Sequence, residues 1–532
     1  MDANTFTVDS IRPDEVSTPI METFKIKSDG SLDKLKARLV VRGDLQNQNL
    51  TEDKWSPTAS FRSLKVFLAH ASRLRCRVCQ LDFVGAFLQA KPRSRILVTI
   101  PKIFGILFPE YAKYCGSPVR LSMSMYGMML SGKYWYLDLL EYLTSVGFKA
   151  SASVPCLFVQ EGENGHRIFL LNYVDDMLYY GTCPTALAAF ESGLKQRFNL
   201  ELLGQAHWYL ATRIHQHNNF DIELDQHRYC KSIVQKYLSQ AGCKKVSHHH
   251  TTPLPADFVP SMDDCSIDES TAKLLEQEYN LDFASCVGSL IYLAMTCCDI
   301  CYAVNKLAKF TRHPGRVHFN ALIHVLRYLR DNSLLGIRFY SEPAQSPLMS
   351  MISMVNPQQS HPLFGFSDSS WNDDVDTGRS TGCFLMIYMG GVIDHSSNLP
   401  DPVALSSVEA EYNEGCIAFM AGSHLRMLIA ELEGSDEQTM APTYIYFDSK
   451  SAVAMGASYK DTKHTRHILR RYHYVREGVN SKCFIMYWID NSLQMADIGT
   501  KNNLGPKHQQ LVEKFHVTIQ DQQPNQPQIQ EG

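Results

Sequence analysis

Two adjacent aspartates, Asp175 and Asp176, lie in the middle of an apolar stretch, RIFLLNYVDDMLYYG at residues 167–181. The apolar runs on either side predict two strands that meet at an acidic turn, which is a β-hairpin anchored in a core. Two ionised carboxylates in a half-buried turn repel each other and lose hydration. A divalent metal removes that cost, because hard carboxylate oxygens suit magnesium. An exposed Asx turn is the alternative interpretation, and the apolar flanks make it less favourable.

A third carboxylate, Asp82, lies at the end of another apolar stretch, CQLDF at residues 79–83. Two metal ions about 4 Å apart need carboxylates gathered from separate strands, and Asp82 with Asp175 and Asp176 would supply them. Taken alone, Asp82 could equally be a strand-end cap. Phe87 follows five residues later and would lie near the same site, although an aromatic side chain there is by default part of a core.

A second set of carboxylates lies nearer the C-terminus, at expected strand ends and helix starts within one domain-sized stretch. Any one of them is by itself more typical of a helix cap, as Asp448 followed by Ser449 illustrates. Together they could bind two magnesium ions and activate a water for attack on a phosphodiester. The candidates are Asp368 in FSDSSW, Glu409 and Glu411 in SSVEAEY, Asp448 in YIYFDSKSA and Asp497 in QMADIGTK.

The composition, with 45% hydrophobic and 20% charged residues, excludes a disordered, collagen-like or coiled-coil chain. Its 532 residues correspond to roughly three to four domains. There is no apolar run of the roughly 18 residues that span a bilayer, and the N-terminus lacks the pattern of a signal peptide. Fifteen scattered cysteines indicate reduced intracellular thiols. The net charge of −4 excludes a uniformly basic protein, but not a basic stripe that binds nucleic acid.

Local patterns divide the chain into elements. Strands with Lys and Arg on one face are expected between Phe24 and Asp44. Polar, Pro-containing loops are expected at 243–270 and 341–362, and the Gln/Pro-rich tail from Gln520 is expected to be disordered. Helical spacing is found at 61–80, 133–147, 284–331, 406–433, 449–457 and 463–478.

The ordered set of motifs over residues 25–255 resembles the reverse transcriptase of copia-type LTR retrotransposons. These motifs are KARLVVRG, QLDFVGAFLQA, MYGM, the Trp135–Tyr136 pair, NYVDDMLYYG and LLGQAHWYLATRI. The C-terminal order Asp, Glu, Asp, Asp resembles the RNase H domain of the same elements, with further support from RSTGCF, TKHTRHILRRYHYVRE and ADIGTK. Matching residue by residue makes Glu411 the metal-binding Glu and leaves Glu409 at the surface.

The resemblance implies a multidomain α/β and α+β chain, a right-hand polymerase with fingers, palm and thumb followed by an RNase H-like mixed-sheet domain. The palm would hold Asp82, Asp175 and Asp176 as metal ligands. The expected domains are 1–255 for fingers, palm and the start of the thumb, 256–355 for a thumb or connection-like linking segment, 356–515 for the RNase H-like domain, and 516–532 for a disordered tail.

Substrate-binding residues also follow from the resemblance. Phe87 matches the bulky residue that blocks a ribose 2′-OH in reverse transcriptases, and Tyr173, in the Tyr-Val-Asp-Asp turn, is assigned to the same substrate site. Lys36 and Arg38 match fingers residues that would contact the incoming triphosphate, as a point charge and a fork respectively. A solvated strand face is the alternative for these two basic residues.

Two basic stretches could follow phosphates without sequence specificity, and a solvated helix face is the alternative for both. One spans residues 463–476, and the other lies in the linking segment 285–319. The pairs Cys76-x-x-Cys79 and Cys298-x-x-Cys301 have no partner pair at zinc spacing, so metal binding there is not expected. The basic residues of the linking segment are Lys306, Lys309, Arg312 and Arg316.

The resemblance implies an RNA-directed DNA polymerase with ribonuclease H activity, which copies retrotransposon RNA into DNA and degrades the RNA of the hybrid. Magnesium, with manganese as a substitute, would be the cofactor. The expected partners are an RNA template, a DNA primer, the RNA–DNA hybrid, deoxynucleoside triphosphates and other parts of a retrotransposon polyprotein, with no membrane. The particles of the family imply a cytoplasmic location in virus-like particles, with nuclear entry.

A catalytically inactive, truncated remnant that at most binds nucleic acid is the main alternative. It is favoured by a start just before the fingers motif, and by Met129, Leu130 and Cys298, which depart from family motifs. The seven intact carboxylates argue against it, because a chain free of selection should lose some. A nuclease whose polymerase half serves only as a scaffold for the hybrid is a third possibility.

Overall fold

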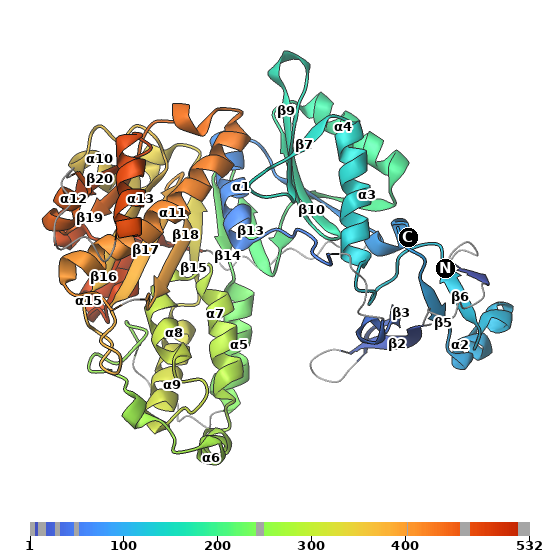
Figure 1. Cartoon of the computed structure of the whole chain (residues 1–532), viewed down its shortest axis with the longest axis horizontal. Helices are drawn as coiled ribbons and strands as arrows, with labels where there is room; N and C mark the ends of the chain where they lie inside the picture. Colours follow the sequence, from blue (N-terminus) through green and yellow to red (C-terminus); the bar gives the residue numbers. More distant parts are fainter. Residues whose placement is uncertain are drawn as a thin grey trace. The chain divides into compact units, whose positions relative to one another are not determined.

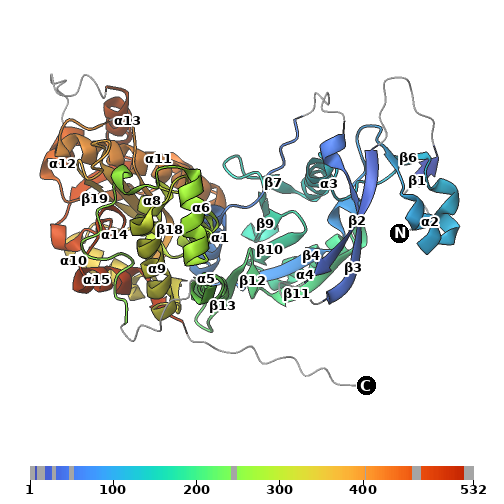
Figure 2. The same cartoon turned by 90° about the horizontal axis from the view of Figure 1, so that it is seen from below.

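The computed structural model divides the chain into two compact units, residues 1–60 with 78–205 and residues 61–77 with 206–532. Figures 1 and 2 show the fold from two directions. The structure describes residues 6–8, 18–26, 32–46, 53–240, 249–401, 403–457 and 469–519.

The first unit is built on a six-stranded antiparallel sheet, and the expected hairpin lies inside it. The hairpin consists of β9 (Arg167–Tyr173) and β10 (Asp176–Gly181), and its turn is acidic as predicted. Helices α3 (Ser131–Ser145) and α4 (Pro184–Arg197) contribute to the core on one side of the sheet (Figure 1). The strand order is β11 (Leu200–Gln205), β4 (Cys79–Phe83), β10, β9, β8 (Leu157–Glu161) and β7 (Phe148–Ala150).

Alternation along these strands explains why one face meets the helices. Leu81 on β4 is opposite Met177 on β10, and both are fully buried in one hydrophobic core. Trp135 of α3 and Leu194 of α4 join the same core. Because side chains alternate between faces with a period of two, the strands present such residues at every second position.

A second, five-stranded sheet in the first unit includes the strands expected between Phe24 and Asp44. Strands β2 (Thr18–Ile26) and β3 (Leu32–Val41) form an antiparallel pair, and β2 also pairs in parallel with β5 (Leu97–Thr99). Helix α2 (Lys102–Leu107) follows β5. The strand order is β1 (Phe6–Val8), β6 (Pro118–Leu121), β5, β2 and β3.

The second unit begins with α1 (Phe61–Arg73), which confirms the helix expected from the spacing at 61–80. Its first sheet is antiparallel, in the order β12 (Trp208–Tyr209), β13 (Thr212–Gln216), β14 (Ile222–Asp225), β15 (Leu335–Phe339) and β21 (Val517–Thr518). Five helices of the described residues lie between β14 and β15 in the chain: α5 (His227–Gln240), α6 (Glu269–Tyr279), α7 (Phe283–Ala294), α8 (Cys301–Ala308) and α9 (Arg316–Asp331).

Strand β21 lies within the stretch assigned to a disordered tail, 516–532. The Ile519 side chain is buried, and its backbone N–H donates to the Leu334 carbonyl. Apolar residues at 517 and 519 therefore extend the ordered chain beyond residue 516, and residues 520–532 lie outside the described part of the chain.

A mixed five-stranded sheet completes the second unit and agrees with the expected RNase H-like arrangement. Strands β16 (Phe364–Ser370), β17 (Thr381–Tyr388) and β18 (Gly391–Asn398) form an antiparallel meander. Strands β19 (Thr443–Phe447) and β20 (Phe484–Trp488) run parallel to β16, which gives the order β18, β17, β16, β19, β20.

Helices surround this mixed sheet. The long helix α11 (Ser407–Glu433) packs on it through Phe419, whose ring lies 4.5 Å from that of Phe484. By length and composition α11 is the one helix among the described residues that could cross a membrane, but 67% of its apolar window is buried, as in a core helix. The remaining helices are α10 (Pro347–Val355), α12 (Lys450–Ala457), α13 (Leu469–Asn480), α14 (Asp497–Thr500) and α15 (Gly505–Phe515).

Candidate catalytic sites

Strand register brings the first group of carboxylates together. Asp176, the first residue of β10, is directly opposite Asp82 on β4. The Phe83 N–H donates to the Asp175 carbonyl over 2.8 Å, which ties the turn to the same strand. All three aspartates are half-buried. The three predicted residues therefore lie together at one end of two inner strands. Asp82 is on β4, Asp176 is on β10, and Asp175 is in the turn between β9 and β10.

The acidic turn is held by an indole. Val174 has a φ of +59°, a left-handed conformation that is strained for a β-branched residue. The buried Trp135 of α3 donates its Nε1–H to the Val174 carbonyl over 2.6 Å. Trp135, which the sequence offered only as part of a family motif, is thus a support of the aspartate turn.

The electrostatics of this turn favour a cation. Burial raises the pKa of Asp176, an amide hydrogen bond from Gln80 lowers it, and the neighbouring charges of Asp175 and Asp82 raise it. The Gln80 contact is long, at 3.4 Å. A divalent ion held by these oxygens would offset both the burial and the repulsion.

Two of the predicted substrate-binding residues, Phe87 and Tyr173, have described side chains in the first unit. The half-buried Phe87 packs against Tyr126, with ring centroids 4.9 Å apart. Tyr173 is half-buried at the end of β9, next to the acidic turn. Lys36 and Arg38 belong to β3, but their side chains lie outside the described residues.

Two of the three departures from the family pattern, Met129 and Leu130, have local structural roles. The Met129 N–H donates to Gln46 Oε1 over 3.0 Å. Leu130 is buried at the start of α3 and accepts a backbone hydrogen bond from Tyr134. Apolar side chains at these positions are compatible with the fold around α3.

The second group of carboxylates is more compact. Asp368 on β16, Glu411 on α11 and Asp448 after β19 each offer an oxygen, and these oxygens lie within 4.8 Å of one another. Asp368 is 1% exposed and Glu411 is 6% exposed. Ser449, rather than Asp448, caps α12, since its Oγ accepts from the Ala452 N–H over 3.2 Å. Three of the four predicted ligands thus converge.

Asp497, the fourth predicted ligand, is held by lysines instead. It lies at the start of α14, and its carboxylate is 2.6 Å from Lys501 Nζ and 3.5 Å from Lys507 Nζ. Lys501 also lies 3.4 Å from Asp368, which in addition accepts a hydrogen bond from Thr500. Sequence reasoning gave no role to Thr500 and Lys501, although they are the last two residues of the ADIGTK motif.

Crowding of buried acids shifts the protonation of this site. Burial raises the pKa of Asp368 to about 6, with Lys501 opposing the rise and Asp497 adding to it. Burial also raises the pKa of Glu411 well above its usual range, and the charges of Asp368 and Asp448 raise it further. Glu411 Oε2 is buried without a hydrogen-bond partner. An all-oxygen donor set with an unpartnered oxygen fits a hard divalent cation.

Sequence reasoning also missed a buried acid on the same helix face. Glu414 lies one turn after Glu411, is fully buried, and has no hydrogen-bond partner at either oxygen. It packs over Gly382, where an added Cβ would fall 2.0 Å from its Oε2, so the glycine of RSTGCF makes room for it. Burial raises the pKa of Glu414 to about 8, the charge of Asp368 raises it, and Arg471 lowers it.

Glu409 corrects an expectation. The family match placed it at the surface, but it is 6% exposed. Its Oε2 accepts from the Leu405 N–H over 3.0 Å, and its own N–H donates to Ser406 Oγ over 3.2 Å. These two bonds satisfy backbone donors at the start of α11, so Glu409 works as a capping residue.

The basic stretch 463–476 falls partly outside the described residues, which resume at 469. On α13, Arg470 and His473 are exposed. Arg471 donates to the Asp401 carbonyl over 2.6 Å, and the guanidinium of Arg476 lies 4.9 Å from the ring of Tyr472. The exposed members are compatible with phosphate contacts, and Arg471 and Arg476 have intramolecular partners.

Most basic residues of the linking segment are paired with acids. Lys306 lies 2.7 Å from Asp373, and Lys309 lies 2.8 Å from Asp374. Arg316 forms a surface ion pair with Glu278 at 2.6 Å, whereas Arg312 is exposed. The pairing gives these two lysines intramolecular partners, so they are less available for phosphate contacts than the exposed Arg312.

Known proteins resemble this chain along most of its length. Residues 3–249 match the family described as reverse transcriptase (RNA-dependent DNA polymerase). The chain is 29% identical to the retrovirus-related Pol polyprotein from transposon TNT 1-94 of Nicotiana tabacum, over 90% of this chain and 34% of the relative. It is 30% identical to the corresponding polyprotein from transposon RE1 of Arabidopsis thaliana, over 93% of this chain and 31% of the relative.

Solved structures are more distant. The foamy viral protease–reverse transcriptase in complex with RNA/DNA hybrid has a TM-score of 0.45 and 12% identity, over 96% of this chain and 53% of that chain.

The chain spans about a third of the length of the two curated relatives. Residues 3–249 therefore belong to the reverse transcriptase family, and along nine-tenths of its length the chain is similar to copia-type retrotransposon Pol polyproteins.

Proposed function

We propose that this chain is an RNA-directed DNA polymerase joined to a ribonuclease H, working as part of a retrotransposon polyprotein. The convergence of Asp368, Glu411 and Asp448 at the edge of a mixed sheet carries the nuclease proposal. The facing register of Asp82 and Asp176, with Asp175 between the strands, supports the polymerase. An inactive remnant is less favoured, because both acidic groups keep their supporting contacts.

In the polymerase, the first unit would provide both the fingers and the palm. Its five-stranded sheet would form the fingers, and its six-stranded sheet would form the palm. Asp82, Asp175 and Asp176 would hold two magnesium ions, or manganese in their place, which when bound stabilise the charge that develops on the reacting phosphate. A primer 3′-OH would attack the α-phosphate in line, and pyrophosphate would leave. Phe87, braced by Tyr126, would exclude a ribose 2′-OH.

The remaining residues of the polymerase site would position the substrate. Tyr173, next to the acidic turn, would contact the nucleic acid at the primer end. Lys36 and Arg38 of β3 would bind the triphosphate, as a point charge and a fork respectively. The substrates would be an RNA template, a DNA primer and deoxynucleoside triphosphates.

In the nuclease, Asp368, Glu411, Asp448 and Asp497 would hold the divalent ions, and a water would attack the phosphodiester of the RNA strand. Lys501 bridges Asp368 and Asp497 in the structure, so it would have to release a carboxylate when a cation binds. The substrate would be the RNA–DNA hybrid. A cytoplasmic location in particles, with nuclear entry, completes the proposal.

The test measures the two activities separately on the full chain. Primer extension on poly(rA)/oligo(dT) with magnesium should be lost in Asp175→Asn/Asp176→Asn, whereas cleavage of the hybrid remains. Asp448→Asn should give the reverse pattern. The matched control is Asp263→Asn/Asp264→Asn, an adjacent aspartate pair that lies in a short 3-10 helix. A folded wild-type chain that performs neither reaction would leave the inactive remnant as the explanation.

A further inference from the structure

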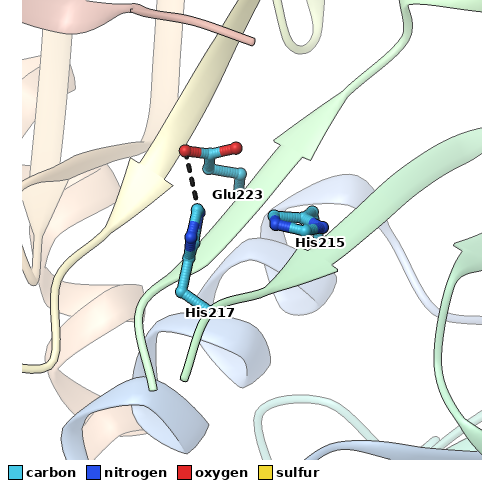
Figure 3. A group of neighbouring side chains, drawn as sticks. All are labelled: His215, His217 and Glu223. Carbon is cyan, nitrogen blue, oxygen red and sulfur yellow. Dashed lines mark ion pairs between the residues drawn. The ribbon is translucent and has the colours of Figure 1, made fainter. Parts of the chain in front are cut away.

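Two histidines and a glutamate form a cluster on the β13–β14 hairpin that neither proposed activity uses. His215 and His217 are two residues apart and so share a face, and His215 is directly opposite Glu223 in the strand register. Figure 3 shows the side chains of His217 and Glu223 pointing toward one another, with His215 beside them. A ligand atom from each of the three lies within 4.8 Å of the others.

The contact between His217 and Glu223 is close without being a hydrogen bond. Nε2 of His217 lies 2.9 Å from Glu223 Oε1. That nitrogen is nevertheless buried with no hydrogen bond, so the two atoms are not aligned as donor and acceptor. The ring of His215 meets the ring of His217 edge-on, with centroids 4.5 Å apart. Two imidazole rings and a carboxylate that converge in this way can serve as ligands of a common ion.

The neighbouring charges leave Glu223 available. Arg338 on β15 is directly opposite Glu223 and reaches its Oε1 at 3.5 Å, but it pairs more closely with Asp221, at 2.7 Å.

We propose that His215, His217 and Glu223 form a binding site for a divalent transition-metal ion of the zinc type. Two imidazole nitrogens and one carboxylate oxygen are a donor set that zinc favours, whereas magnesium prefers oxygen alone. The side chain of His217 is 29% exposed, which leaves a path for the ion and a position for a water as fourth ligand. The bound ion would cross-link β13 to β14.

Zinc affinity of the full chain tests the site directly. Zinc is titrated against a chromophoric chelator in excess magnesium, which saturates the all-oxygen acidic groups. The wild-type chain should bind zinc roughly tenfold or more tightly than His217→Asn or Glu223→Gln, because each variant removes one of three ligands. His207→Asn, an exposed histidine on the preceding segment, should bind like the wild type. Equal affinity in all four proteins would overturn the proposal.

A second readout separates lost binding from lost folding. Zinc should raise the melting temperature of the wild-type chain by several degrees, because the ion binds only the folded hairpin. Glu223→Gln preserves side-chain shape and should keep the metal-free melting temperature while losing the zinc-dependent rise. Cobalt should give visible ligand-field absorption in the wild type and none above the remaining background in His215→Asn/His217→Asn. Absorption unchanged in that double variant would assign the metal to other ligands and overturn the proposal.

Discussion

Glu414 is a carboxyl group whose protonation couples to folding. Its ordinary pKa of 4.5 rises to about 8 through burial in the second unit. Between these values the unfolded chain has released the proton and the folded chain keeps it, so stability falls as pH rises across this window. Glu414→Gln removes that slope. We expect the variant to be more stable than the wild type by about 1–3 kcal/mol at pH 8, measured by urea unfolding.

The same comparison at pH 3.5, below both pKa values, supplies the internal control, because the wild-type carboxyl is then largely protonated in both states. Glu477→Gln, an exposed acid on α13, should follow the wild type at both pH values. A wild type and a Glu414→Gln variant with parallel pH profiles would contradict the buried, unpartnered position of this side chain.

Two tryptophans support the two acidic groups in the same way. The Trp135 indole donates to the Val174 carbonyl beside Asp175, and the Trp488 indole donates to the Asp448 carbonyl over 3.0 Å. Without the indole N–H the backbone carbonyl is no longer held in place, and the adjacent carboxylate can move. Small displacements of a catalytic group lower the reaction rate strongly. Trp135→Phe should therefore lower primer extension roughly tenfold or more and spare hybrid cleavage. Trp488→Phe should do the opposite.

Each tryptophan variant serves as the control for the other, because both lose only an indole N–H and some aromatic area. Both activities are measured on the same preparations, with circular dichroism to confirm folding. Equal losses of both activities in either variant would indicate a general stability effect in place of local support.

Sequence reasoning reached the elements and most of the acidic residues, because these depend on local patterns. The hairpin at 167–181 and the helix that begins at Phe61 follow directly from periodicity. Tertiary neighbours could not be read in this way. The contacts of Lys501 with Asp368 and of Glu414 with Gly382 join chain segments more than thirty residues apart in the sequence.

At the scale of elements, a buried ion pair joins the linking segment to the end of α15. Asp299 in η6 (Cys298–Ile300) lies 3.1 Å from His516 Nε2, and both residues are buried. The Tyr328 hydroxyl donates to the other carboxylate oxygen of Asp299 over 2.7 Å. The Cys298 thiol, a departure from the family pattern, lies 3.6 Å from the same histidine nitrogen. The pair fixes the C-terminal segment before β21.

His516→Ala should destabilise the second unit by about 3 kcal/mol at pH 7, because it leaves a buried carboxylate without its partner. Burial lowers the pKa of His516, but its contacts with the Cys298 and Asp299 side chains raise it to about 10 overall. The contribution of His516 is therefore complete below about pH 6.5 and is lost as pH rises toward 10. Thermal unfolding from pH 6 to pH 10 measures this loss.

The control for this pair is His473→Ala, an exposed histidine on α13, which should melt like the wild type. Asp299→Asn should also flatten the alkaline decline, because it removes the charge that holds the proton on His516. An alkaline decline that persists unchanged in both pair variants would assign it to other groups.

At the scale of the whole molecule, the two compact units are interleaved in sequence. Helix α1 lies within the part of the chain that matches the reverse transcriptase family, yet it belongs to the second unit. Arg62 pairs with Asp394 at 2.8 Å, Lys65 donates to the Met295 carbonyl over 2.9 Å, and Ser72 donates to Phe339. The domain boundaries expected at residues 255, 355 and 515 remain predictions. A cut at residue 255 would separate α1 from Met295, Phe339 and Asp394, the residues that it contacts.

A fragment of residues 206–532 should therefore be unstable although it contains every residue of the proposed nuclease site. In this fragment α1 is missing, so the apolar surface against which it packs is exposed and the Asp394 carboxylate loses its partner Arg62. The same fragment with residues 61–77 fused ahead of it through a Gly/Ser linker should melt at least several degrees higher and recover hybrid cleavage. A fusion in which Arg62, Lys65 and Ser72 are replaced by alanine is the matched control and should recover less. Equal melting temperatures with and without α1 would show that the second unit folds without this helix. The contacts of α1 would then contribute nothing to the stability of the second unit.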